Sequence, residues 1–183
     1  MNYVVTSTLP ATFGGRTKSL LKRTKLLMKE GYEFTLISTN YRNNYEQIYD
    51  LYINKGYVPE NTKFINIYDF LREESSDLPE LHHSVDEANL ISEKIEGKSA
   101  YRYFDNGIYT FYKDFSYPNG QLKFIDVMSP HSESKIIRKE FDAEGHLQRE
   151  IFYAYNSALK IQEVLYNKDG SPFINRLFKN NKE

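Results

Sequence analysis

The stretch TLPATFGGRTKSLLKR, residues Thr8–Arg23, decides the fold of the first part of the chain, because it joins a short apolar run to a basic helical pattern. Residues 2–7 before it predict a strand, and residues 16–29 predict a helix with leucines on one side. The alternation continues with a strand at 33–38, a helix at 44–54 and a strand at 63–68. Strands and helices that alternate across short connections are typical of α/β proteins with a parallel sheet.

The glycine pair in this stretch is open to two interpretations, a flexible turn or an anion-binding loop. Ligands of α/β sheets bind beyond the carboxyl ends of the strands, and a helix that begins there offers amide groups and a positive end. Gly14 and Gly15 would let the backbone approach a ligand closely, and Arg16 and Lys18 would add positive charge. The full glycine-rich fingerprints of dinucleotide-binding and P-loop proteins are absent, which argues against a conventional site of either kind.

From Ser99 onward the hydrophobic period changes to two, which predicts an antiparallel sheet. Seven runs read as strands, namely 101–104, 108–115, 121–128, 135–141, 147–153, 159–166 and 173–178. Four of the separators end in a glycine and carry turn residues, at positions 107, 120, 145 and 170. The predicted fold class is therefore α/β plus all-β. It consists of a partial Rossmann-like unit at 1–72, a linker at 73–98, a large antiparallel β-meander at 99–178 and a tail at 179–183.

The predicted linker is acidic and rich in serine at its start. Residues 84–87 form a capping-box pattern, so a short helix and an extended crossing both remain open there. His82 and His83 lie in this linker without a third ligand at suitable spacing, and His131 and His146 lie beside predicted turns. We interpret all four as solvated residues, and we assign neither metal ligands nor a catalytic residue.

The overall composition narrows the class of function. The net charge is −1, so the chain has no global field that would attract nucleic acid. The chain contains no cysteine, which fits a reducing cytoplasm, and no apolar run approaches the ~20 residues of a membrane span. The basic run at residues 16–25 is interrupted by leucines, and we interpret it as a solvated helix face or as an approach surface for a polyanionic acceptor.

The predicted meander is unusually rich in aromatic residues. The stretch YRYFDNGIYTFYKDF, residues 101–115, places rings on both faces of its strands. Either these rings tolerate exposure, or the second face meets another subunit, a partner protein or an acceptor polymer.

The glycine loop and the order of elements resemble a known family. The strand followed by TLPATFGGRTKSLLKR is similar to the N-terminus of retaining GT-B glycosyltransferases. The α/β part that ends in NIYDFLRE, followed by a Tyr-rich meander with PNGQLKFID and FDAEGHLQREIFY, resembles the arrangement in poly(glycerol-phosphate) and poly(ribitol-phosphate) α-glycosyltransferases of wall teichoic acid synthesis. It also resembles the glycosyltransferases that modify Ser-rich adhesins.

This resemblance implies a hexosyltransferase that takes a nucleotide-sugar, a UDP-sugar, as its substrate without a further cofactor. It implies a donor-binding role for Gly14 and Gly15, with Arg16 and Lys18 as neighbours. The acceptor would be a teichoic acid polymer or a glycoprotein, at a cytoplasmic location or peripherally at the inner membrane face. The resemblance also implies homo-oligomerisation or partner docking through the meander.

The sequence departs from the family in what it lacks. Family members carry paired glutamates in an E-x7-E motif in a C-terminal domain, and no two glutamates of this chain have that spacing. We therefore expect the N-terminal portion of such an enzyme, inactive alone. The alternative is a non-enzymatic module whose β-sheet oligomerises or binds a partner.

Overall fold

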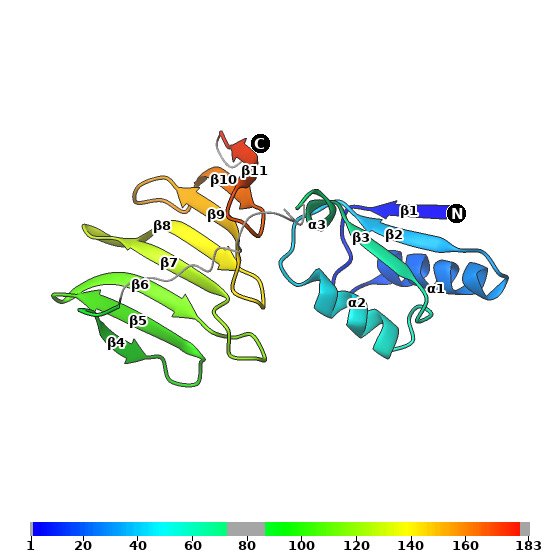
Figure 1. Ribbon diagram of the computed structural model, residues 1–183, viewed down its shortest axis with the longest axis horizontal. Coiled ribbons are helices and arrows are strands. Elements are labelled where there is room, and N and C mark those ends of the chain that lie inside the picture. The colour runs from blue at the N-terminus through cyan, green and yellow to red at the C-terminus, as the bar shows by residue number, and fades with distance from the viewer. Residues whose placement is uncertain (1, 73–86, 180–183) are drawn as a thin grey trace. The chain divides into compact units, whose positions relative to one another are not determined.

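The computed structural model describes residues 2–72 and 87–179 of the chain. The chain divides into two compact units, Met1–Leu71 and Arg72–Glu183. The first contains helices and a parallel sheet, and the second contains an antiparallel sheet (Figure 1). The predicted combination of a small α/β unit with a large β-meander is confirmed.

The first unit is a three-stranded parallel sheet with helical crossovers. Its elements in chain order are β1 (Asn2–Thr6), α1 (Gly15–Lys29), β2 (Phe34–Ser38), α2 (Tyr45–Asn54), β3 (Lys63–Asn66) and α3 (Ile67–Leu71). Both β1 and β3 pair in parallel with β2. The short helix α3 begins within the last two residues of the run at 63–68 that the sequence predicts as strand. The strand ends early because the side-chain oxygen of Asn66 accepts hydrogen bonds from the backbone amides of Tyr68 and Asp69.

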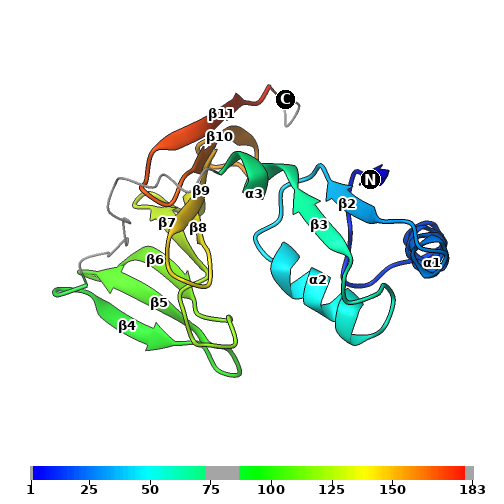
Figure 2. The same cartoon turned by 45° about the vertical axis from the view of Figure 1, so that its right-hand side comes forward.

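The core of this unit lies on one face of the sheet, between the strands and both long helices (Figure 2). Leu21 of α1, Leu36 of β2 and Ile48 and Tyr52 of α2 are each at most 2% exposed. The other face is bare along β1, where Tyr3 and Val5 are 59% and 64% exposed. Parallel sheets are ordinarily covered by helices on both faces, whereas the helices α1 and α2 cover only one face of this sheet.

The second unit is one eight-stranded sheet whose strands pair in the order of the chain (Figure 1). Its elements are β4 (Ile91–Lys94), β5 (Ala100–Asp105), β6 (Ile108–Asp114), β7 (Phe124–Ser129), β8 (Ser132–Phe141), β9 (Leu147–Tyr153), β10 (Lys160–Tyr166) and β11 (Pro172–Leu177). Asn106 and Gly107 form the two-residue turn between β5 and β6, with φ of 48° and 83°. Both values belong to the turn type that matches the twist of a hairpin.

The sheet begins earlier than the sequence predicts. Strand β4 lies inside the predicted linker and pairs antiparallel with β5. Its four residues are exposed and only Ile91 is apolar, so it lacks the alternation that marks a strand. The prediction of solvated histidines at 82 and 83 lies outside the described residues.

Most rings of the meander are half-buried, and several of them contact other rings of the same sheet. Tyr112 stacks on Phe124 at 5.6 Å, Tyr101 meets Phe115 edge-on at 5.9 Å, and Tyr103 is 7% exposed. Cross-strand ring pairs of this kind stabilise a sheet without a second layer. The rings thus contact one another within the sheet, and association through a strand face stays a prediction.

One face of the meander carries a ladder of paired charges. Asp126 on β7 receives two hydrogen bonds from Arg138 on β8, at 2.7 and 2.6 Å. Glu163 on β10 is 2% exposed and accepts from three cations, namely Arg149, Lys160 and Arg176. These charges are mutually compensated, so the ladder is a structural feature of the sheet.

Candidate functional site

The glycine loop joins the carboxyl end of β1 to the first turn of α1. Gly14 precedes the helix in an extended conformation, with φ of −94°, and its carbonyl oxygen accepts the first helical hydrogen bond from the amide of Lys18 at 3.1 Å. Gly15 is the first residue of the helix. A Cβ added at Gly14 or Gly15 would meet no atom within 4 Å. Neither the backbone conformation nor the internal packing therefore requires glycine, and the open space in front of the loop is what the pair provides.

The loop before the glycines is fixed to α2 by two tyrosine hydroxyls. The Tyr45 hydroxyl accepts a hydrogen bond from the Leu9 amide at 3.4 Å, and the Tyr52 hydroxyl donates to the Pro10 carbonyl at 2.6 Å. Phe13 packs edge-on against Tyr52, with ring centroids 5.5 Å apart. The loop thus enters the glycine pair in a defined conformation, which is the pre-organisation that a binding loop needs. The sequence indicates these tyrosines only as one side of an amphipathic helix.

A polar network holds the other strand ends at the same edge of the sheet. The side-chain amide of Asn66, at the end of β3, donates to the Ser38 hydroxyl at 2.8 Å and to the Asn40 carbonyl at 2.9 Å. The Ser38 hydroxyl also contacts the Tyr49 hydroxyl at 3.2 Å. Burial raises the pKa of Tyr49 to about 12, so this hydroxyl stays protonated at neutral pH. The hydrogen-bonded groups of this network are neutral, whereas α1 is basic.

Helix α1 carries six basic residues and no acidic one, namely Arg16, Lys18, Lys22, Arg23, Lys25 and Lys29. Arg16 and Lys18 lie in its first turn and are exposed, and their side chains form no hydrogen bond or ion pair with any described residue. Cations at a helix N-terminus oppose the helix dipole and cost about 0.3–1 kcal/mol each. An anion bound at this end would reverse that balance.

Two of the four predicted donor-site residues, Arg16 and Lys18, differ in whether they line a hollow. Lys18 lines a hollow of about 660 Å3 between the glycine loop, α1 and the end of α2, whereas Arg16 is outside its lining. We call this hollow the lysine hollow, after the four lysines in its wall, Lys18, Lys22, Lys25 and Lys55. The sequence could not show it, because Lys55 meets the other lysines only through the packing of α2 against α1.

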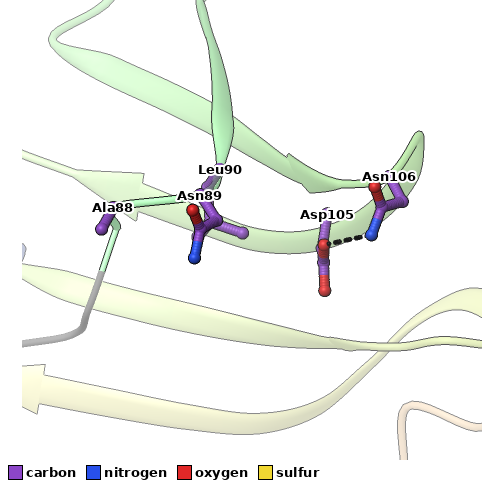
Figure 3. A pocket seen from close by; sticks show the side chains of 5 residues that line it. All are labelled: Ala88, Asn89, Leu90, Asp105 and Asn106. Atoms are coloured by element: carbon purple, nitrogen blue, oxygen red, sulfur yellow. Dashed lines mark hydrogen bonds between the residues drawn. The ribbon is translucent and has the colours of Figure 1, made fainter.

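A second hollow, of about 640 Å3, lies in the meander beside the β5–β6 turn (Figure 3). It is lined by Ala88, Asn89, Leu90, Asp105 and Asn106, and the Asn106 amide donates to the Asp105 carboxylate at 3.0 Å. None of the described residues in its lining is a cation, which makes this part of the wall unsuited to a phosphate-bearing ligand.

The prediction that His146 is a surface residue is wrong. His146 is 2% exposed, and its Nδ1 lies 3.1 Å from the Asp142 carboxylate, which also accepts a hydrogen bond from Arg72 at 3.1 Å. Asp142, Glu144 and His146 bring three potential ligand atoms within 4.8 Å of one another. The Arg72 guanidinium occupies one Asp142 oxygen and repels a cation, so the cluster is best explained as a hydrogen-bonded turn. His131 is exposed.

Known proteins share both the sequence and this architecture. The chain is 26% identical over 184 residues to a poly(ribitol-phosphate) α-N-acetylglucosaminyltransferase of Staphylococcus aureus (strain COL), covering 95% of this chain and 36% of the relative. S. aureus TarM, solved with fondaparinux, α-GlcNAc-glycerol and UDP, matches 98% of this chain and 36% of its own, with a TM-score of 0.73 and 21% identity. The chain is therefore similar in sequence to part of the first protein and similar in fold to part of the second.

A streptococcal structure agrees in fold. The pneumococcal O-GlcNAc transferase GtfA, solved with UDP and GlcNAc, matches 100% of this chain and 36% of its own, with a TM-score of 0.68 and 18% identity. The predicted GT-B resemblance is thereby confirmed. No protein-family model matches the chain.

The chain spans about a third of the length of the relatives it matches, 36% in each of these three comparisons. Among the described residues, no helix has the length and apolar character needed to cross a membrane.

Proposed function

We propose that the chain forms the donor-side part of a glycosyltransferase, which transfers a sugar from a UDP-sugar to a teichoic acid polymer or a glycoprotein. The observation that carries this proposal is the glycine loop at the carboxyl end of β1, which opens into unoccupied space at the positive end of a basic helix. The names of the relatives, a poly(ribitol-phosphate) transferase and an O-GlcNAc transferase, support the two acceptor classes.

In the proposed role the chain binds and orients the donor. Backbone amides at Gly14 and Gly15 would face the donor phosphates, because residues without a side chain allow close approach. Arg16 is exposed and without an ion-pair partner among the described residues, so its guanidinium is available to the same phosphates. The proposal assigns Lys18 a weaker part in donor binding, since it lines the lysine hollow.

We expect little or no sugar transfer by the 183-residue chain alone. Catalysis needs the donor and the acceptor held together, and the relatives that transfer sugars are about three times as long as the matched part. Release of UDP from UDP-GlcNAc in the presence of an acceptor, at rates typical of enzymes, would contradict this expectation.

The test of donor binding is NMR titration of the chain with UDP-GlcNAc. Amide shifts should change at residues 14–18, and Gly15→Val should weaken binding roughly tenfold or more, because a branched side chain blocks the approach. Ser19→Val is the matched control, since it places the same side chain at an exposed site further along α1.

Both variants should melt at similar temperatures, because the space around Gly15 is empty. Equal donor affinity in the two variants, or a large loss of melting temperature for Gly15→Val alone, would show that the glycine pair is structural.

A further inference from the structure

The lysine hollow concentrates positive charge on one side of the first unit. Lys18, Lys22 and Lys25 follow one another at helical spacing and therefore share one face of α1. Lys55 joins them from the C-terminal end of α2. None of the described residues that line the hollow is acidic.

The charges of this hollow lack internal compensation. Lys25 is held in place, since its ammonium group donates a 2.6 Å hydrogen bond to the Gly56 carbonyl. The side chains of Lys18, Lys22 and Lys55 form no hydrogen bond or ion pair within the part of the chain that the structure describes. Like charges on one helix face repel each other, so the arrangement costs stability until an anion neutralises it.

The floor of the hollow suits a ligand with a carbon skeleton between its charges. Phe13, Leu21, Leu51 and Tyr57 contribute apolar surface. The Tyr57 ring is 41% exposed and is fixed edge-on by Phe13, with centroids 5.1 Å apart. A ring beside ammonium groups provides both a hydroxyl partner and an apolar surface for a polyol or sugar phosphate.

The hollow is longer than one phosphate group. Lys18 and Lys25 are separated by seven residues, which corresponds to about 10 Å along a helix. We propose that the lysine hollow binds successive phosphate groups of a polyol-phosphate chain, as a docking site for a polyanionic acceptor. The inference rests on the proposed function for the role of that polymer, but it uses Lys22 and Lys55, which are outside the predicted donor-binding set.

The experiment measures binding of a synthetic ribitol-phosphate oligomer to the whole chain by calorimetry. Lys22→Gln and Lys55→Gln should each raise the Kd roughly two- to fivefold, and the double variant roughly tenfold, because each removes one exposed ion pair. Arg23→Gln is the control, since it removes an exposed cation of α1 that does not line the hollow. Inorganic phosphate and anionic lipid vesicles serve as comparison probes.

The inference is supported if the oligomer binds more tightly than inorganic phosphate and the Lys22 and Lys55 variants weaken it more than the Arg23 variant does. It is overturned if the oligomer does not bind, if the three single variants are equivalent, or if only the vesicles bind. UDP-GlcNAc titration of the same variants separates the two proposals. If UDP-GlcNAc binds but the lysine substitutions leave oligomer binding unchanged, the docking site is ruled out and the donor role stands. If UDP-GlcNAc does not bind but the oligomer binds through the lysines, the donor role is ruled out and the docking site stands.

Discussion

The Tyr52 hydroxyl donates a 2.6 Å hydrogen bond to the carbonyl oxygen of Pro10. This bond joins α2 to a loop more than forty residues earlier in the chain, four residues before the glycine pair. The Tyr52 side chain is completely buried, so water cannot replace the bond if it is lost. The position of the glycine loop therefore depends on a residue outside that loop.

Tyr52→Phe should lower the free energy of unfolding by about 1–2 kcal/mol, because it leaves the Pro10 carbonyl without its partner. Donor affinity should fall as well, because the loop loses an anchor. Tyr49→Phe is the control, since it removes a hydroxyl contact with Ser38 and leaves the loop untouched. Urea unfolding and UDP-GlcNAc titration measure the two effects. An equal loss of donor affinity in both variants would show that the Tyr52 hydrogen bond does not position the loop for donor binding.

Glu163→Gln should destabilise the second unit by about 3–5 kcal/mol, because it neutralises a buried carboxylate that accepts hydrogen bonds from three cations. Glu93→Gln, on the exposed strand β4, should change stability by less than about 0.5 kcal/mol. Chemical unfolding of both variants measures the difference. Similar stabilities would mean that the charge of Glu163 is not needed to hold the three cations.

Stability should fall as the pH rises above about 10, the ordinary pKa of tyrosine. Burial, followed by the nearby Asp142 carboxylate, raises the pKa of Tyr117 to about 12. In this range the unfolded chain loses the tyrosine proton while the folded chain keeps it, so ionisation favours unfolding. The contribution is complete below pH 10 and is lost as the pH approaches 12.

Ultraviolet absorbance of tyrosinate and urea unfolding at increasing pH measure this effect. Tyr117→Phe should flatten the alkaline decline, although the loss of its 2.8 Å hydrogen bond to the Phe141 carbonyl lowers stability at every pH. An unchanged slope in this variant would assign the decline to other groups.

Association through the meander stays a prediction, and the edge strands offer one place for it. The edge strands β4 and β11 expose Ile91 and Leu177, at 66% and 71%, beside unpaired backbone groups. Light scattering of the whole chain should show a mass that rises with concentration, and Leu177→Lys should reduce that rise. A monomer mass at all concentrations would remove the edges as an interface.

Features that depend on residues close together in the sequence could be predicted from it. The seven strands after Ser99 follow from period-two patterns, and the turn at Asn106 and Gly107 follows from its residues. Strand β4 was not predictable, because one apolar residue at a solvated edge gives no alternation. The burial of His146 likewise depends on the Asp142 carboxylate that holds it.

The residues of the candidate site also divide into those that the sequence predicts and those that only the packing reveals. The glycine pair and Arg16 were predictable because they follow one another between a strand and a helix. Tyr52 and Lys55 contribute through the packing of α2 on the glycine loop and α1, and no local pattern records that contact. The donor role of Gly14, Gly15, Arg16 and Lys18 remains a proposal.

The strand order of the meander has a consequence for how the protein folds. Every strand of the eight-stranded sheet pairs with its neighbours in the chain, so each step closes only a short loop. Such low contact order favours rapid folding by successive hairpins. The first unit must instead close a helical crossover before each pair of its parallel strands can form. We therefore expect kinetic experiments to resolve two phases, with hydrogen exchange protecting the amides of β6–β9 before those of β1–β3.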